Sequence, residues 1–228
     1  MERGLYIAAS GMLAEMVRQD QIANDLANSS TPGYKPDRAT QRSFDQILLQ
    51  NTMSGQTVGN IGFGVQIDSI ETDMSPGALR LTGDPLDFGI DGEGFFAVQT
   101  PQGVRYTRNG QFSVNAEGFL VNSMGFQVLS PNGAPIRAPR TGAVDPADVG
   151  VFDVPNARKE GESLFTGAAG GQATGRVRAG TLEGSGAEPS RSMVDMIASF
   201  RAFEAGQRVI RTIDDTLQRA AGQVGALS

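Results

Sequence analysis

Proline and glycine are distributed very unevenly along this chain, which limits where long helices can form. All 11 prolines lie between Pro32 and Pro189, and 25 of the 30 glycines lie between residues 31 and 189. Both residue types interrupt regular helices. The chain of 228 residues is therefore predicted to have two helical ends around a central region that is rich in turns.

The first segment carries apolar or small residues which, with Gln19 included, recur at alternating steps of four and three, the spacing of a heptad seam. A helix is predicted to run roughly from residue 3 to residue 28 and to end at Asn28–Gly33, where short polar residues, Pro and Gly come together. Leu13, Val17 and Ile22 widen the apolar stripe, so we expect this helix to pack on more than one side. The seam residues are Leu5, Ala9, Met12, Met16, Ala23 and Leu26.

The last segment predicts a second long helix, which begins after Pro189 with a capping box from Ser192 to Asp195. Its heptad is irregular near Gly206, where the spacing predicts a three-residue stammer that overwinds a coiled coil locally. The two helices can pack on each other within one molecule or on copies of the chain, and the spacing leaves both arrangements open. The seam residues of this helix are Met193, Met196, Phe200, Phe203, Ile210, Ile213 and Leu217.

Between the helices, the sequence is typical of antiparallel β-structure. Gly94–Gln99 and Val104–Arg108 flank the turn residues 100–103, which predicts a hairpin, and Asn109–Gly110 predicts the next turn. The predicted fold class is α+β, with a long helix at each end of the chain and a mostly antiparallel β domain in the centre. The predicted segments are an N-terminal helix at 1–34, a linker at 35–60, a β domain at 61–189 with a loop-rich part at 138–188, and a C-terminal helix at 190–228.

The composition excludes many kinds of active site. The chain has no Cys, His or Trp, which removes thiol nucleophiles, imidazole bases, disulfides and metal sites built on Cys or His. Its net charge of −6 disfavours nucleic acid and anionic lipid as partners. The longest apolar stretch, Leu5–Ala14, is too short to span a membrane. Chemistry based on carboxylate, hydroxyl or arginine side chains remains possible.

An acidic cluster is the strongest remaining candidate for chemistry. Asp84, Asp87, Asp91 and Glu93 lie close together in sequence, but their spacing does not match an EF-hand calcium loop. Two carboxylates held about 5 to 9 Å apart in a cleft can act as general acid and base. A carboxylate-dependent hydrolase using Asp87 and Asp91 is therefore the alternative from the enzyme class. Acidic turns between strands are the structural interpretation, which we favour.

Motifs at the start, middle and end of the chain are more specific than its periodicity. They are Met1–Met12, Ile22–Asn28, Thr31–Lys35, Leu81–Asp87, Gly94–Phe96, Tyr106–Phe112, Gly180–Ser185, Met193–Ile197 and Arg201–Glu204. Together they resemble the signatures of the rod proteins of the bacterial flagellar basal body, most closely the proximal and distal rod proteins. The sequence departs from these signatures at a few positions, since Asp25 replaces the usual Asn and Tyr34 the usual Phe. The stretch from Ile136 to Leu164 is shorter than in the family, which implies one or more missing strands.

The resemblance implies a structural subunit of the rod and no enzyme, with no catalytic residue, no cofactor, no metal and no small-molecule substrate. It also implies that the terminal helices pair as a coiled-coil domain. Its partners would be copies of itself, other flagellar rod and hook proteins, and the flagellar export apparatus through which it leaves the cell unfolded. The terminal helices would line the inner wall of a helical tube that transmits torque, with the seam residues of both helices as the assembly interface. The implied location is the basal body in the cell envelope, within the periplasm where an outer membrane is present. A hook subunit or another tubular surface protein is the alternative of the same class.

Overall fold

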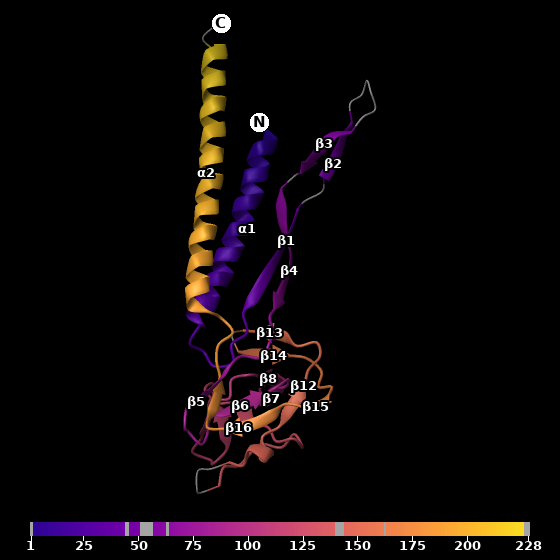
Figure 1. Cartoon of the computed structure of the whole chain (residues 1–228), viewed down its shortest axis with the longest axis vertical. Coiled ribbons are helices and arrows are strands. Elements are labelled where there is room, and N and C mark those ends of the chain that lie inside the picture. Colours follow the sequence, from indigo (N-terminus) through magenta and orange to yellow (C-terminus); the bar gives the residue numbers. More distant parts are fainter. Residues whose placement is uncertain are drawn as a thin grey trace. The chain divides into compact units, whose positions relative to one another are not determined.

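A computed structural model describes residues 2–43, 46–50, 57–62, 64–139, 144–161 and 163–225. The chain divides into two compact units. The helical unit contains Met1–Leu26, Asp37–Glu71 and Pro189–Ser228, and the β unit contains Ala27–Pro36 and Thr72–Glu188. The fold class is α+β, as predicted, because the two terminal helices pack together and the centre is an antiparallel β region (Figure 1).

Helices α1 (Glu2–Ala27) and α2 (Pro189–Gly225) form where the sequence lacks prolines within its helical stretches. The predicted limits agree with the structure within a few residues, and residues 226–228 of the predicted C-terminal helix lie outside the described part. After α1 the chain turns at Asn28, whose carbonyl accepts a hydrogen bond from the Thr31 N–H at 3.0 Å. Gly33 then adopts a φ of +66°, a backbone conformation that favours glycine.

Residues 35–60 are not a linker, in contrast to the prediction. The described part of this stretch contains strands β1 (Asp37–Ser43), β2 (Gln46–Gln50) and most of β3 (Thr57–Gly62), and β4 (Val65–Thr72) follows. Strand β1 pairs with β4, and β2 pairs antiparallel with β3. The polar sequence of β1 hid it, because backbone pairing rather than an apolar face defines this strand. Residues 44–45 and 51–56 of the predicted linker lie outside the described residues.

The largest sheet of the β unit has nine strands, in the order β13–β14–β8–β7–β11–β10–β9, with β12 paired to β7 and β15. Strands β7 and β8 form the predicted hairpin, in which Phe96 lies opposite Thr107 and Thr100 opposite Gly103. The strands of this sheet are β7 (Phe95–Thr100), β8 (Gly103–Thr107), β9 (Phe112–Val114), β10 (Leu120–Asn122), β11 (Gln127–Val128), β12 (Val151–Asp153), β13 (Arg158–Glu160), β14 (Leu164–Thr166) and β15 (Gly171–Gln172).

Two smaller antiparallel pairs complete the β unit. Strand β6 (Phe88–Asp91) pairs with β16 (Arg176–Ala179), and β5 (Leu79–Leu81) pairs with β17 (Thr181–Glu183). The part predicted as loop-rich, residues 138–188, holds six strands of two to four residues and the short 3-10 helix η1 (Pro146–Asp148) among its described residues. Residues 61–71, which we predicted within the β domain, belong to the helical unit.

The hydrophobic core lies in the β unit. Phe88, Phe96, Val98, Leu120 and Val128 are almost completely buried in one cluster. A second cluster packs Phe95 against Phe165 with ring centroids 5.2 Å apart. The T-shaped pair of Phe96 and Phe112, at 5.3 Å, adds an edge-to-face contact within the first cluster. The β unit therefore buries its large apolar side chains within a single chain.

Candidate assembly surface on the terminal helices

The two terminal helices run antiparallel, because residues early in α1 contact residues late in α2. A Cβ placed on Gly4 would lie 3.4 Å from Cδ1 of Ile213, and one on Gly206 would lie 2.7 Å from Cγ of Met12. Further along, the Ser199 hydroxyl donates to the Glu15 carboxylate at 2.5 Å, and Arg18 faces Asp195 at 3.9 Å. The pairing of the terminal helices is thus built within one molecule.

The face of α1 that contacts α2 shares Met12 with the predicted seam and otherwise consists of neighbouring residues. Its contacts involve Gly4, Ala8, Met12 and Glu15, whereas the prediction placed the seam at residues 5, 9, 12 and 16. Small residues allow the two helices to approach closely, and a search for large apolar residues selects the neighbouring stripe instead. The contact with α2 within one chain therefore includes Met12 and three residues outside the predicted seam, while the assembly role of the seam stays a prediction.

The structure divides the thirteen predicted interface residues into two groups, although no contact with another subunit tests them. The half-buried group contains Leu5, Ala9, Met12, Leu26, Met196, Phe203, Ile210 and Ile213. The exposed group contains Met16, Ala23, Met193, Phe200 and Leu217. The assembly role of both groups stays a prediction.

The seam of α2 runs without the predicted stammer. Burial recurs at Met196, Ser199, Phe203, Gly206 and Ile210, in steps of three and four. Ser199 is 1% exposed, and its buried hydroxyl donates a hydrogen bond to Glu15. The prediction missed this position, since a polar residue and a glycine do not register in an apolar pattern. A sequence search that also accepted small polar residues at seam positions could have found Ser199.

Each helix also carries an exposed apolar stripe, which we call its outer stripe. The outer stripe of α1 consists of Tyr6, Leu13 and Met16, which are 72%, 64% and 48% exposed. The outer stripe of α2 consists of Met193, Ile197 and Phe200, which follow at steps of four and three. Contiguous apolar patches on a protein surface typically mark contacts with another molecule. The outer stripes are thus candidates for contact with another molecule.

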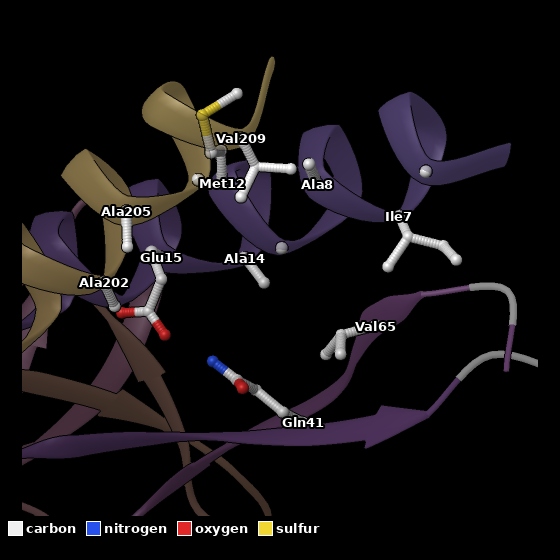
Figure 2. A pocket seen from close by; sticks show the side chains of 13 residues that line it. Ile7, Ala8, Met12, Ala14, Glu15, Gln41, Val65, Ala202, Ala205 and Val209 are labelled. Atoms are coloured by element: carbon white, nitrogen blue, oxygen red, sulfur yellow. The ribbon is translucent and has the colours of Figure 1, made fainter. Parts of the chain in front are cut away.

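A groove opens between α1, α2 and the strands β1 and β4. Its cavity of about 440 Å³ is lined mainly by small and apolar residues, and Ser10 anchors β4 to α1 by accepting a hydrogen bond from the Val65 N–H at 3.3 Å. Figure 2 shows Ile7 and Val65 toward one end of this space and Glu15 and Gln41 toward the other. The lining residues, which define the groove, are Gly4, Ile7, Ala8, Gly11, Met12, Ala14, Glu15, Gln41, Val65, Ala202, Ala205, Gly206 and Val209.

A buried ion cluster ties together three distant segments of the β unit. The Glu183 carboxylate, 1% exposed, accepts hydrogen bonds from Lys35 Nζ at 2.6 Å, from Arg108 Nη1 at 3.1 Å and from the Gly77 N–H at 2.6 Å. Lys35 Nζ also donates to the Ser75 carbonyl at 2.6 Å. Two positive charges thus share one buried negative charge. Because burial removes water from both cations, it lowers the pKa of Lys35 and of Arg108 from their ordinary values.

Backbone hydrogen bonds hold the same segments together beside the ion cluster. The Gly33 N–H donates to the Glu183 carbonyl at 2.9 Å, and the Ser185 hydroxyl donates to the Asn28 carbonyl at 2.9 Å. A Cβ on Gly33 would overlap the carbonyl of Arg108, so only glycine allows this close approach. The residues that follow α1 and those that precede α2 are therefore fastened to each other within the β unit.

Reasoning from the sequence missed this cluster, although its members lie in the motifs Thr31–Lys35, Tyr106–Phe112 and Gly180–Ser185. A compositional signal was present, because the chain has only two lysines, Lys35 and Lys159. Both meet here: Lys159 Nζ donates to the Lys35 carbonyl at 2.8 Å and lies 4.2 Å from the centre of the Tyr34 ring. Rare lysines in a chain that otherwise uses arginine mark a site where a compact cation is needed.

The acidic cluster has structural roles in the β unit. The Asp84 carboxylate accepts a hydrogen bond from the Leu86 N–H at 2.9 Å, which closes a turn. Asp91 pairs with Arg178 at 2.5 Å across the β6–β16 ladder. Asp87 is buried and forms an isolated backbone bridge with Gln111. Within the described ranges, no group of three or more acidic side chains is placed to hold a metal ion.

Comparisons with known proteins match the ends and the centre of the chain to one family. Residues 5–35 match the family model described as "Flagella basal body rod protein", and residues 89–166 match "Flagellar hook protein FlgE/F/G D1 domain". Residues 178–223 match "Flagellar basal body rod FlgEFG protein C-terminal". The chain is 30% identical to the flagellar basal-body rod protein FlgG of Bacillus subtilis, with 96% of this chain and 97% of the relative aligned. The chain belongs to the flagellar basal-body rod protein family.

Two further relatives support this assignment over nearly the whole chain. FlgG of Agrobacterium fabrum is 32% identical, with 93% of this chain and 96% of the relative aligned. The rod protein FlgF of Rhizobium meliloti is 29% identical, with 99% of each chain aligned. The alignment with the Bacillus protein spans 257 positions, more than the 228 residues of this chain, so that relative has extra residues inside the aligned region.

Membership of the family makes this chain a structural subunit of the flagellar basal-body rod. Neither helix contains a stretch, within the described residues, that is long and apolar enough to cross a membrane. All three family models include parts of the observed structure: α1 and the segment after it, the main sheet of the β unit, and most of α2.

Proposed function

We propose that this rod subunit assembles with copies of itself and with other rod and hook proteins into a helical shaft that transmits torque, with its terminal helices as the packing surface. The observation that carries the proposal is the pair of outer stripes, which leave large side chains such as Tyr6, Leu13 and Phe200 in water. Full burial of one such side chain contributes about 1.5 to 3 kcal/mol. Several of them buried per subunit supply the driving force for assembly.

The geometry of the outer stripes favours an assembly that does not close. The stripe on α1 and the stripe on α2 differ in sequence and shape, so a contact between them joins two different surfaces. Such a heterologous contact leaves one free copy of each surface at the ends of every oligomer, and further subunits can add. Repeated addition with a constant rotation produces a helical array, the form that a shaft requires.

The same proposal includes the route to the assembly site. We infer that the subunit passes through the flagellar export apparatus unfolded and folds at the growing rod, in the periplasm where an outer membrane is present. A chain without cysteine forms no disulfide that would block passage or need an oxidant afterwards. The subunit acts by packing and has no enzymatic role in this proposal, in keeping with the structural roles of Asp84 and Asp91.

The substitution Phe200→Asp tests the packing surface. Phe200 is 55% exposed, so the change should leave the free subunit folded while placing a charge where a neighbouring subunit packs. We expect cells that carry this variant as their only copy to lose motility and rod incorporation, measured by swimming and by immunoblots of isolated basal bodies. Val114→Asp is the matched control, since Val114 is 39% exposed on the β unit, outside both helices.

The outcomes separate cleanly. Loss of incorporation for Phe200→Asp with normal incorporation for Val114→Asp supports packing through the helices. Normal motility of the Phe200→Asp strain contradicts it. Circular dichroism of both purified variants shows whether either substitution has changed the fold.

A further inference from the structure

The C-terminal part of helix α2 extends well beyond the N-terminal end of α1. Gly4, near the start of α1, lies against Ile213, and α2 continues for another twelve residues to Gly225. At 1.5 Å per residue this extension is about 18 Å long. We call residues 214–225 the overhang. Residues 214–222 of the overhang are all exposed, so α1 does not cover them.

The seam of α2 continues into the overhang in register. Buried or half-buried positions at Phe203, Gly206, Ile210 and Ile213 follow steps of three and four, and Leu217 and then Ala220 take the next positions. Leu217 is nevertheless 40% exposed. The apolar seam of α2 therefore continues past the residues that α1 covers. This exposed part of the seam is a surface that another molecule can bury.

The groove defined above has a mainly apolar lining, and its cavity of about 440 Å³ has room for apolar side chains presented by a helix of this kind. Along α1 it extends from Gly4 to Glu15, about 17 Å at the usual helical rise, which matches the length of the overhang. Its small residues, such as Ala8, Gly11 and Ala205, leave room for the backbone of a helix to come close. In Figure 2 the apolar side chains of Ile7, Ala14 and Val65 surround the open space.

Building on the rod-subunit role argued above, we propose that the groove is a socket for the overhang of a second copy of this chain. Leu217 and Ala220 of one copy fill the cavity between α1, α2 and β4 of the next. Because the overhang and the groove are different surfaces, each copy still offers one of them after the contact forms, so the chain of contacts extends along an axis. The continuity of the seam and the matched lengths favour a copy of this chain as the occupant.

An engineered disulfide between subunits tests the socket. The chain has no cysteine of its own, so every disulfide of this chain must involve an introduced thiol. The double variant Ala205→Cys with Leu217→Cys places one thiol in the groove and one on the overhang. Within one chain the two positions lie twelve residues apart on the same helix, about 18 Å, which is too far for a disulfide. Basal bodies isolated from cells that carry this variant are oxidised and separated on a non-reducing gel. We expect a ladder of reducible multimers of the 24.0 kDa chain.

Matched variants control for chance collisions and for misfolding. Val114→Cys with Leu217→Cys places a thiol on an exposed part of the β unit, outside the groove and both outer stripes, and it should give no ladder. If Ala205→Cys prevents incorporation, Ala202→Cys with Leu217→Cys uses another groove residue for the same measurement. Motility and immunoblots report incorporation independently of cross-linking.

Every outcome decides between specific alternatives. A ladder for a groove pair alone supports the socket. Rods that incorporate the groove pairs without cross-links overturn the socket and leave the rod-subunit role standing. Cross-links to a protein of another mass overturn the choice of a second copy as occupant, and products that stop at the dimer overturn the propagating arrangement. Absence of the unaltered chain from basal bodies overturns the proposed function itself.

Discussion

The helical unit exposes many of its large apolar side chains, whereas the β unit buries most of its own. Among the described residues, eleven of the fifteen large apolar side chains that are exposed belong to the helical unit. The same unit contributes only Ala14, Ile22 and Ser199 to the buried residues of the described chain. The β unit instead buries residues as large as Phe88, Phe96 and Phe165 completely. One unit thus has a core of its own, and the other leaves many of its large apolar side chains exposed in the single chain.

This difference has a thermodynamic consequence. A unit with a buried core draws its stability from that core at any protein concentration. Two paired helices with exposed stripes gain most of their stability when a partner covers the stripes, because isolated helices are marginal in water. We therefore expect the two units of the free subunit to differ in stability, and the difference to shrink on assembly.

Amide hydrogen exchange on the free subunit gives the largest expected contrast. Amides of residues 5–26 in α1 should exchange about a thousandfold faster than those of β7 and β8, because opening the helical unit exposes little buried surface. Mass spectrometry of peptides after timed deuteration measures the contrast. Slow exchange throughout residues 5–26 in the monomer would show that the helical unit needs no partner.

Glu183→Gln probes the ion cluster of the β unit and is the next largest effect. The substitution keeps the shape of the side chain but leaves Lys35 and Arg108 buried without a counter-charge. Removing one partner from a buried ion pair costs about 3 to 5 kcal/mol, so the midpoint of urea unfolding of the β unit should fall sharply. Glu160→Gln is the control, since Glu160 pairs with Arg105 at 2.5 Å but is 52% exposed, and it should cost less than about 1 kcal/mol. Equal costs for both substitutions would contradict the buried role.

A pair of phenylalanines compares the two units directly. Phe165→Ala empties a site in the β unit that is fully buried against Phe95, which should cost about 3 to 5 kcal/mol of unfolding free energy. Phe200→Ala removes a side chain that is 55% exposed in the free subunit and should change its unfolding free energy by less than about 0.5 kcal/mol. Denaturant titrations of the two variants measure both values. A large loss for Phe200→Ala would mean that this side chain already has a partner within one chain.

Local patterns in the sequence were sufficient to predict the elements that depend on neighbouring residues. The two helices follow from the absence of internal proline and from the heptad spacing, and the β7–β8 hairpin follows from the turn residues 100–103. Strand β1 was missed because its sequence, Asp37–Ser43, is polar and its strand character comes from pairing with β4. Local pattern does not encode a partner almost thirty residues away.

The candidate site shows the same division. The heptad predicted that each helix has an apolar face to bury and left the partner of that face open. The contact between α1 and α2 depends in part on Gly4, Ala8 and Glu15, which an apolar pattern ignores. The ion cluster joins Lys35 to Glu183 across 148 residues, so its geometry exists only in the folded chain. Sequence motifs marked where the cluster's residues lie, and only the structure showed that they meet.

The pH dependence of stability gives the smallest and most specific test of the ion cluster. Burial lowers the pKa of Lys35 below its ordinary 10.5, more than the neighbouring Glu183 carboxylate raises it. In the window between that lowered pKa and 10.5 the unfolded chain binds more protons at this position than the folded chain. The contribution of Lys35 to the free energy of unfolding must therefore increase as the pH rises through the window, by at most about 1.4 kcal/mol per pH unit.

Lys35→Met isolates this contribution, because Met fills a similar volume and does not titrate. The difference in unfolding free energy between the unaltered chain and Lys35→Met, measured by urea titration at a series of alkaline pH values, should change in favour of the unaltered chain as the pH approaches 10.5. A difference that moves the other way would mean that the bond to Glu183 outweighs burial and raises the pKa of Lys35. The measurement thus decides whether desolvation or ion pairing has the larger effect on the pKa of Lys35 in the buried ion cluster.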